Sequence, residues 1–164
     1  MKSSKLRRRG RTRATPVITQ ARIEPLDGVP FHTSGPITRW LMASQTLDPR
    51  VGVHIALHEM NDVEPATRSY CAPHVHDCDE LNIFHTTSTL EVEVRLDDAV
   101  HLVKAPASVV IPAGTVHAAN VRSGSGFMVV VLLEGRYRAT AASDPDLDGA
   151  SRALDSRDAA SSRS

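Results

Sequence analysis

Residues 73–80 of the chain read Pro-His-Val-His-Asp-Cys-Asp-Glu, and residues 111–117 read Ile-Pro-Ala-Gly-Thr-Val-His. Together these two segments hold three imidazoles and a carboxylate, which combine borderline nitrogen donors with a hard anionic oxygen. Such a donor set suits a first-row divalent metal ion. The candidate ligands are His74, His76, Glu80 and His117.

The spacing of these residues favours a β scaffold. His74 and His76 are two residues apart, so on an extended strand both side chains project from one face. Glu80 has the same parity, and residues 77–79 are expected to form a turn or bulge that leads into the next strand. His117 follows a Pro-x-Gly turn, which would deliver a third imidazole from a separate strand. The spacing therefore predicts a mononuclear metal site on a β scaffold.

The pattern His-x-His-x-x-x-Glu followed by Pro-x-Gly-x-x-His resembles the two sequence motifs of the cupin superfamily. The resemblance extends over roughly residues 50 to 135. It implies an all-β fold, namely a single-domain cupin-type antiparallel β-barrel (jelly roll). It also implies one divalent transition metal per chain, held by His74, His76, Glu80 and His117. Cupins include oxygenases, isomerases, decarboxylases, lyases and non-catalytic binders, so the resemblance leaves the reaction open.

The chain departs from the family motifs at positions that flank the ligands. Arg68 and Thr87 stand where the first motif usually opens and closes with glycine, and Pro106 stands where the second commonly opens with one. Asn120 follows the last histidine by three residues instead of the usual four. These differences affect turns and strand ends, while the ligand positions match.

Alternation of apolar and polar residues predicts strands over much of the chain. Residues 90–96 place every second, apolar residue on a buried face and charged residues on a wet one. Residues 51–57 alternate in the same way, so their valine, isoleucine and leucine side chains are expected inside. His54 and His58 then belong to the opposite face and are expected at the surface, with the pocket as the alternative for His58.

Shorter signals complete the expected β architecture. The apolar runs at residues 108–111 and 127–133 suit central strands, and residues 96–99 and 123–126 are typical of turns. Residues 37–46 fit either a strand or a short helix. Short strands separated by turns, without an alternation of strands and helices, indicate an antiparallel sandwich or barrel.

Charge is distributed unevenly along the 164 residues. The chain has 19 basic and 19 acidic residues, yet residues 2–13 contain seven basic residues and no acidic one, which leaves 12 basic and 19 acidic for the remainder. The acidic remainder argues against nucleic-acid binding by the folded domain. The alternative for the arm itself is a segment that binds nucleic acid or an anionic surface. We predict a disordered basic arm at 1–16, a barrel at 17–138 and a disordered polar tail at 139–164.

Cysteine content, targeting segments and internal repeats indicate the compartment and the assembly. Cys71 and Cys78 are too few for a disulfide framework and are interpreted as reduced thiols of a cytoplasmic protein. We identify neither a secretory signal nor an apolar run of about 18 residues, so no membrane association is expected. The absence of an internal repeat favours one barrel, and the resemblance to single-barrel cupins implies a homodimer.

Several other side chains are candidates for the substrate pocket. Asn82 and Phe84 share the parity of Glu80, which makes Asn82 a candidate catalytic contact to substrate or water and Phe84 a pocket wall. Tyr70 is expected at the cavity rim, with His58 as a further pocket residue. Further apolar candidates for the lining are Val110, Phe127 and Met128. Few charged residues are expected there to clamp a phosphate or a sugar acid.

These observations predict a metalloenzyme that acts on a small, metal-chelating organic molecule. Fe(II) and oxygenation with dioxygen are favoured. Mn(II), Ni(II) or Zn(II) acting as a Lewis acid in an isomerase, decarboxylase or lyase is the alternative. Glu80 is expected either to ligate the metal or to leave it and act as a base. A non-catalytic small-molecule-binding cupin is the remaining hypothesis.

Overall fold

The computed structural model describes residues 16, 18–65 and 69–142. Within them every regular element is a strand except one 3-10 turn at Leu26–Gly28, so the predicted all-β class is confirmed. The predicted basic arm and polar tail lie almost wholly outside the described residues. Thr140–Ala141 form a short strand, which extends the barrel past the predicted boundary at residue 138. No helix in the described part of the chain is long and apolar enough to cross a membrane.

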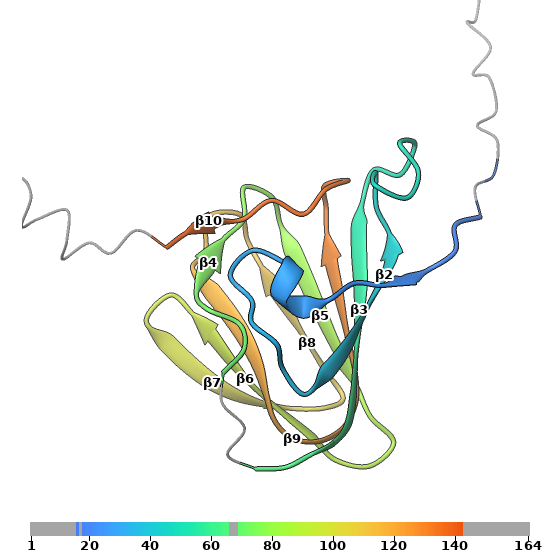
Figure 1. The fold of residues 1–164 in the computed structure, drawn as a ribbon. Coiled ribbons are helices and arrows are strands. Elements are labelled where there is room, and N and C mark those ends of the chain that lie inside the picture. Colours follow the sequence, from blue (N-terminus) through green and yellow to red (C-terminus); the bar gives the residue numbers. More distant parts are fainter. Residues whose placement is uncertain (1–15, 17, 66–68, 143–164) are drawn as a thin grey trace, which may run out of the picture.

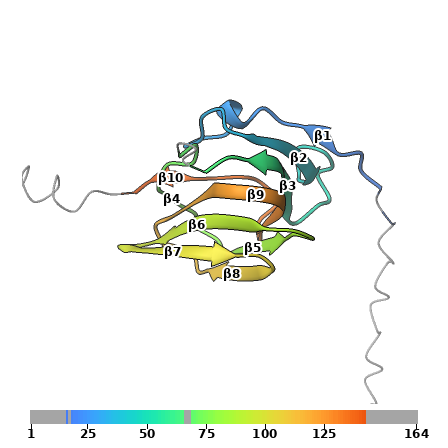
Figure 2. The same ribbon diagram turned by 90° about the horizontal axis from the view of Figure 1, so that it is seen from below.

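In the described residues, the antiparallel strands form one ten-stranded hydrogen-bonded network, which is divided here into two sheets that share strand β9 (Figure 1). The first sheet has the order β1-β2-β3-β9-β5-β8, and the second has the order β7-β6-β9-β4-β10. Figure 2 shows β2 and β3 on one side of the molecule and β6 and β7 on the other, with β9 between them. The strands span Arg22–Ile23 (β1), Ile37–Ala43 (β2), His54–Val63 (β3), His74–Val75 (β4), Glu80–His85 (β5), Leu90–Leu96 (β6), Ala99–Lys104 (β7), Ala107–Ile111 (β8), His117–Leu132 (β9) and Thr140–Ala141 (β10).

Strand β9 continues through residues 123–126, where the sequence predicts a turn. Its first half pairs with β6, and its second half pairs with β3 and β5. At the change-over Gly124 has a φ of 96°, and a Cβ on Gly124 or Gly126 would overlap the carbonyl oxygen of Thr89 or His85, respectively. The prediction of a turn is therefore wrong. These glycines instead let one strand bend from the second sheet into the first.

The core lies between the two sheets and includes the apolar face of β6. Leu90, Val92 and Val94 are buried and the intervening glutamates are partly exposed, which confirms the alternation predicted for residues 90–96. The turn predicted at residues 96–99 is also present, between β6 and β7.

Strand β3 turns toward the barrel interior the face that was expected at the surface. His54 and His58 are buried, whereas Ile55 and Leu57 are only partly buried on the outer face. The expected surface position is therefore wrong for His54, and for His58 the alternative position, in the pocket, is the one observed. The reason is Arg39 on neighbouring β2, whose buried guanidinium hydrogen-bonds to both imidazoles. A buried polar group with a partner costs little to bury, so this pairing overrides the hydropathy pattern.

The two apolar runs differ in position. Residues 127–132 form a central strand segment, as predicted, because β3 and β5 flank it. By contrast β8 pairs only with β5 and lies at a sheet edge, so its predicted central position is wrong. Val110 and Phe127 are 69% and 41% exposed and therefore do not line the barrel. Residues 37–46, which fitted a strand or a helix, contain strand β2.

The bend in β9 generates a stability prediction. Replacing Gly124 with alanine should lower the free energy of unfolding by at least about 2 kcal/mol, because the new Cβ meets the Thr89 carbonyl and the residue keeps a positive φ. Gly52 has no atom within 4 Å of the position of a Cβ, so Gly52→Ala should change stability by less than about 0.5 kcal/mol. Urea unfolding of both variants measures the difference, and equal stabilities would contradict this account of the bend.

Candidate metal centre

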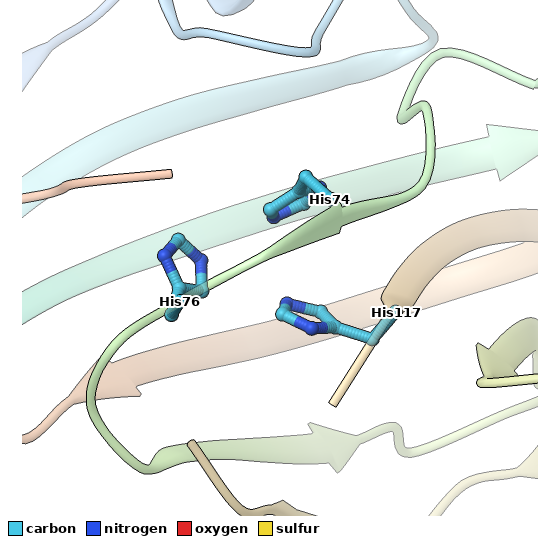
Figure 3. A group of neighbouring side chains, drawn as sticks. All are labelled: His74, His76 and His117. Atoms are coloured by element: carbon cyan, nitrogen blue, oxygen red, sulfur yellow. The ribbon is translucent and has the colours of Figure 1, made fainter. Parts of the chain in front are cut away.

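Three buried imidazoles lie close together where β4 pairs with β9 (Figure 3). His74 comes from β4, His76 from the residue just after it and His117 from the first position of β9. One potential ligand atom from each lies within 4.8 Å of the others, so the group could hold a metal ion. Figure 3 shows the three rings turned toward a common space between their strands. The register places His74 directly opposite His117, which brings the two sequence motifs together.

Turn hydrogen bonds connect the two motifs. The Asp79 carboxylate accepts a hydrogen bond from the backbone N–H of Ala113, and the backbone N–H of Gly114 donates to the carbonyl of His76. Asn120 fixes the segment that precedes His74, because its Oδ1 accepts hydrogen bonds from the backbone N–H groups of Tyr70 and Cys71. The ligand geometry therefore rests on a network of backbone contacts.

Each of the three imidazoles has its Nδ1 atom engaged by a backbone carbonyl. The Nδ1 atoms of His74 and His117 lie 2.9 Å from the carbonyl oxygens of Ala72 and Thr115, and that of His76 hydrogen-bonds to the carbonyl of Arg138. A carbonyl oxygen only accepts, so each Nδ1 carries the proton. In the neutral ring the lone pair then resides on Nε2, which is the tautomer that binds a metal.

Glu80 lies beside two of these Nε2 atoms. Its Oε2 is 3.2 Å from Nε2 of His76 and 3.3 Å from Nε2 of His117, and the carboxylate is buried. Burial by itself would raise the pKa of Glu80, but the interactions with His117 and His76 outweigh it, so the pKa of this carboxyl is lowered. Burial likewise opposes the charged form of His117, while Glu80 raises its pKa. Glu80 is accordingly an ionised carboxylate at neutral pH.

The donor atoms of the site suit a bound cation. In the described part of the chain, the buried Nε2 atoms of His76 and His117 have no hydrogen-bond partner, because their contacts to Glu80 are not aligned as hydrogen bonds. Burial also lowers the pKa of His74 to about 4, which keeps that ring neutral. Buried lone pairs without a donor are costly, and a divalent ion would satisfy them.

A small cavity of about 30 Å³ adjoins these residues, with room for about two water molecules. Tyr137, from the irregular segment after β9, closes one side of it. Its hydroxyl lies 3.2 Å from Nε2 of His74, and its ring centroid lies 4.9 Å from that of His76. Burial raises the pKa of Tyr137, so its hydroxyl stays protonated and donates toward His74.

Comparison with solved structures finds the same architecture. A cupin 2 conserved barrel domain protein from Rhodopseudomonas palustris superposes with a TM-score of 0.53 at 15% identity, over 80% of this chain and 82% of that one. A cupin-2 domain from Rhodospirillum rubrum gives a TM-score of 0.51 at 17% identity, over 86% of this chain and 88% of the other. The protein has the cupin fold. No protein-family profile matches the chain, and neither does the sequence of any curated protein.

Two of the four predicted pocket residues line the metal cavity, and the other two do not. His58 and Asn82 line the cavity, and the Asn82 Oδ1 has no hydrogen-bond partner among the described residues. Phe84, predicted as a pocket wall, is packed in the core instead. Tyr70 is also buried away from the cavity, where its hydroxyl accepts a hydrogen bond from the backbone N–H of Val121. Both side chains are packed in the barrel interior and do not reach the metal cavity.

The sequence patterns do not mark Arg39 and Tyr137, yet both residues line the metal cavity. Arg39 is only 3% exposed on β2 and shares the inward parity of Leu41. A cationic residue in register with a buried leucine is the signal that could have found it once the strand was assigned. Tyr137 lies outside any regular strand, so no periodic signal marks it.

A second group of potential ligands lies near the surface of the cupin barrel. It comprises Asp77, Cys78 and Glu134, none of which is buried. Both cysteines of the chain are free thiols. The contrast in burial and in unpartnered nitrogen atoms favours the histidine cluster as the metal site.

Metal content should therefore depend on the histidines and not on Cys78. His74→Ala and His117→Ala should each weaken metal binding by at least about 100-fold, because each removes a direct ligand. Cys78→Ser is the matched control and should retain one metal per chain. Elemental analysis with a thermal melt of each variant tests this. Full metal content in both histidine variants, or its loss in Cys78→Ser, would assign the metal elsewhere.

Proposed function

We propose that this protein is a mononuclear metal-dependent enzyme acting on a small metal-chelating organic molecule, with Fe(II)-dependent oxygenation as the favoured reaction. The observation that carries the proposal is the donor set itself. Three buried imidazoles, each with its Nδ1 proton held by a backbone carbonyl, place potential ligand atoms within 4.8 Å of one another beside the Glu80 carboxylate. Nothing else among the described residues gathers donors of this quality in a cavity.

His74, His76, Glu80 and His117 would hold the ion. Four protein ligands leave two positions of an octahedral ion for exogenous ligands, which suits a chelating substrate and dioxygen. When bound, Fe(II) would supply redox chemistry for oxygenation, whereas Mn(II), Ni(II) or Zn(II) would polarise a carbonyl as a Lewis acid. The lowered pKa of Glu80 supports a role as ligand, since a carboxylate that resists protonation is a weak base.

Other residues of the chain would exclude water and orient the substrate. Ala119, Met128 and Val130 give the cavity an apolar wall, which limits hydration around the donors. The unpartnered Oδ1 of Asn82 can accept a hydrogen bond from a substrate hydroxyl or amine. A cavity of about 30 Å³ takes only the reacting group of a substrate, so the remainder would extend past Tyr137.

A Lewis-acid reaction is the second candidate, and Tyr137 favours it. Its protonated hydroxyl reaches 3.2 Å from His74 Nε2 and lines the cavity, where it could give a hydrogen bond or a proton to a substrate oxygen. A general acid placed at the reacting group contributes to many such isomerisations and eliminations. An oxygenation relies on it less.

Three further expectations stay predictions. A homodimer is consistent with the exposed apolar side chains Ile83, Val110 and Phe127 on the first sheet, and sedimentation equilibrium would measure it. The cytoplasmic location and the absence of nucleic-acid binding by the folded domain also stay predictions.

Metal identity and oxygen uptake separate the reaction classes. We expect protein purified without chelators to contain about one metal ion per chain, and anaerobic Fe(II) loading to enable oxygen uptake with an added enol or catechol. Elemental analysis and an oxygen electrode measure the two quantities, with His117→Ala as the control. Bound zinc, nickel or manganese without oxygen uptake would transfer the assignment to Lewis-acid catalysis. A protein without metal would instead be a non-catalytic binder.

Replacing Tyr137 with phenylalanine distinguishes the same two classes by rate. In a Lewis-acid enzyme Tyr137→Phe should lower kcat by about 100-fold with metal content unchanged, because the proton donor is lost. In an oxygenase the loss should stay below about 10-fold. Tyr70→Phe is the matched control, since Tyr70 does not line the cavity. Steady-state kinetics with a compound that the protein turns over provides the measurement.

A further inference from the structure

Arg39 places a buried guanidinium at the wall of the metal cavity. Its Nε donates to Glu24 at 3.0 Å, and its Nη1 and Nη2 donate to the Nε2 atoms of His58 at 2.7 Å and His54 at 3.1 Å. A guanidinium has five N–H groups, so one remains on each Nη nitrogen after these three bonds. The described residues provide no partner for these two N–H groups.

Charge near Arg39 is unbalanced once a divalent ion is considered. His54 and His58 accept hydrogen bonds from the guanidinium through Nε2, and burial with the Arg39 charge lowers the pKa of His54 to about 4 and that of His58 well below its usual range. Both imidazoles are therefore neutral. Glu24 and Glu80 offset two of the three positive charges of Arg39 and the ion, which leaves one net positive charge in a poorly hydrated space.

One unpartnered donor at the cavity also favours an anion. His58 Nδ1 must carry the proton, because its Nε2 accepts from Arg39, and this buried N–H has no partner among the described residues. A buried donor is normally satisfied. The cavity thus contains the Arg39 cation and an additional N–H donor on His58. Both would be satisfied by an anionic hydrogen-bond acceptor.

We propose that Arg39, oriented by Glu24, His54 and His58, binds the carboxylate of a small carboxylic acid substrate beside the metal. The proposal rests on the proposed function and names its substrate class. A planar guanidinium with two free N–H groups matches a carboxylate well, and such charge-assisted bonds are about twice as strong as neutral ones. The subsite revises the expectation that few charged residues would clamp an acid in this pocket.

A second cavity suggests where the rest of the acid would lie. It measures about 220 Å³ and shares Arg39 and Tyr137 with the metal cavity. His54 and Arg136 also line it. An acid whose carboxylate contacts Arg39 could therefore extend its remaining atoms into this larger space while its other oxygen donor faces the histidines.

Acetate and acetamide are suitable probes because they share a shape and differ in charge. We would load the full-length protein with Co(II) and titrate it with each probe while following the visible spectrum of the ion and, by calorimetry, the binding heat. The variants are Arg39→Met, which removes the charge, and Arg39→Lys, which keeps the charge and loses the planar fork. Arg50→Met is the matched control, since Arg50 is exposed and paired with Asp48.

We expect the wild type and Arg50→Met to bind acetate at least about 10-fold more tightly than acetamide. Arg39→Met should lose about 10-fold or more in acetate affinity, Arg39→Lys less, and both should keep Co(II) and acetamide binding within about 3-fold. Unchanged acetate affinity in Arg39→Met would overturn the carboxylate subsite and leave the metal centre intact. Failure of the wild type to bind Co(II) would overturn the proposed function and this inference together.

Arg39→Met leaves Glu24 without its cation and could fail to fold. A crystal structure of the Co(II)-loaded wild type grown with acetate then decides the question. The acetate carboxylate within hydrogen-bond distance of the Arg39 Nη atoms supports the subsite. Acetate bound only elsewhere, or no acetate in the cavity, overturns it.

Discussion

Strand β9 belongs to both sheets, and the rest of the molecule depends on this sharing. Its first residue, His117, lies opposite His74 in the second sheet, while Met128 and Val130 near its end line the cavity from the first. The bend between these parts requires close approach of backbone at Gly124 and Gly126, which only residues without a side chain permit. The bend thus closes the two sheets around one core and fixes the distance between the ligands and the opposite wall.

The polar interior is organised in two connected groups. One consists of the three histidines, whose Nδ1 protons go to backbone carbonyls, together with Glu80. The other is Arg39 with its two neutral imidazoles and Glu24. Tyr137 contacts both, because its hydroxyl reaches His74 while Arg39 lies over its ring at 5.8 Å. Burying polar groups is costly unless they have partners. Among the described residues, the buried side-chain atoms without a partner belong to residues that line the metal cavity, except Nδ1 of His54, which lines the second cavity.

Local sequence patterns predicted part of this arrangement and failed where long-range pairing intervened. The parity of His74, His76 and Glu80 and the alternation of residues 90–96 depend only on the geometry of an extended chain, so they could be read directly. The orientation of β3 could not, because the neighbour that stabilises His54 and His58 inside the barrel is on another strand. The glycines of β9 were read as a turn because a turn and a bend between sheets use the same residues.

By itself, the sequence determined the all-β class and a set of histidines and a carboxylate at spacings suited to one metal ion, because both follow from short-range periodicity and side-chain chemistry. Only the tertiary structure decided that Arg39, His58 and Tyr137 meet these residues while Tyr70 and Phe84 do not. The physical reason is that inward-facing side chains form a site only together with side chains from neighbouring strands. Local sequence patterns do not show which strands become neighbours.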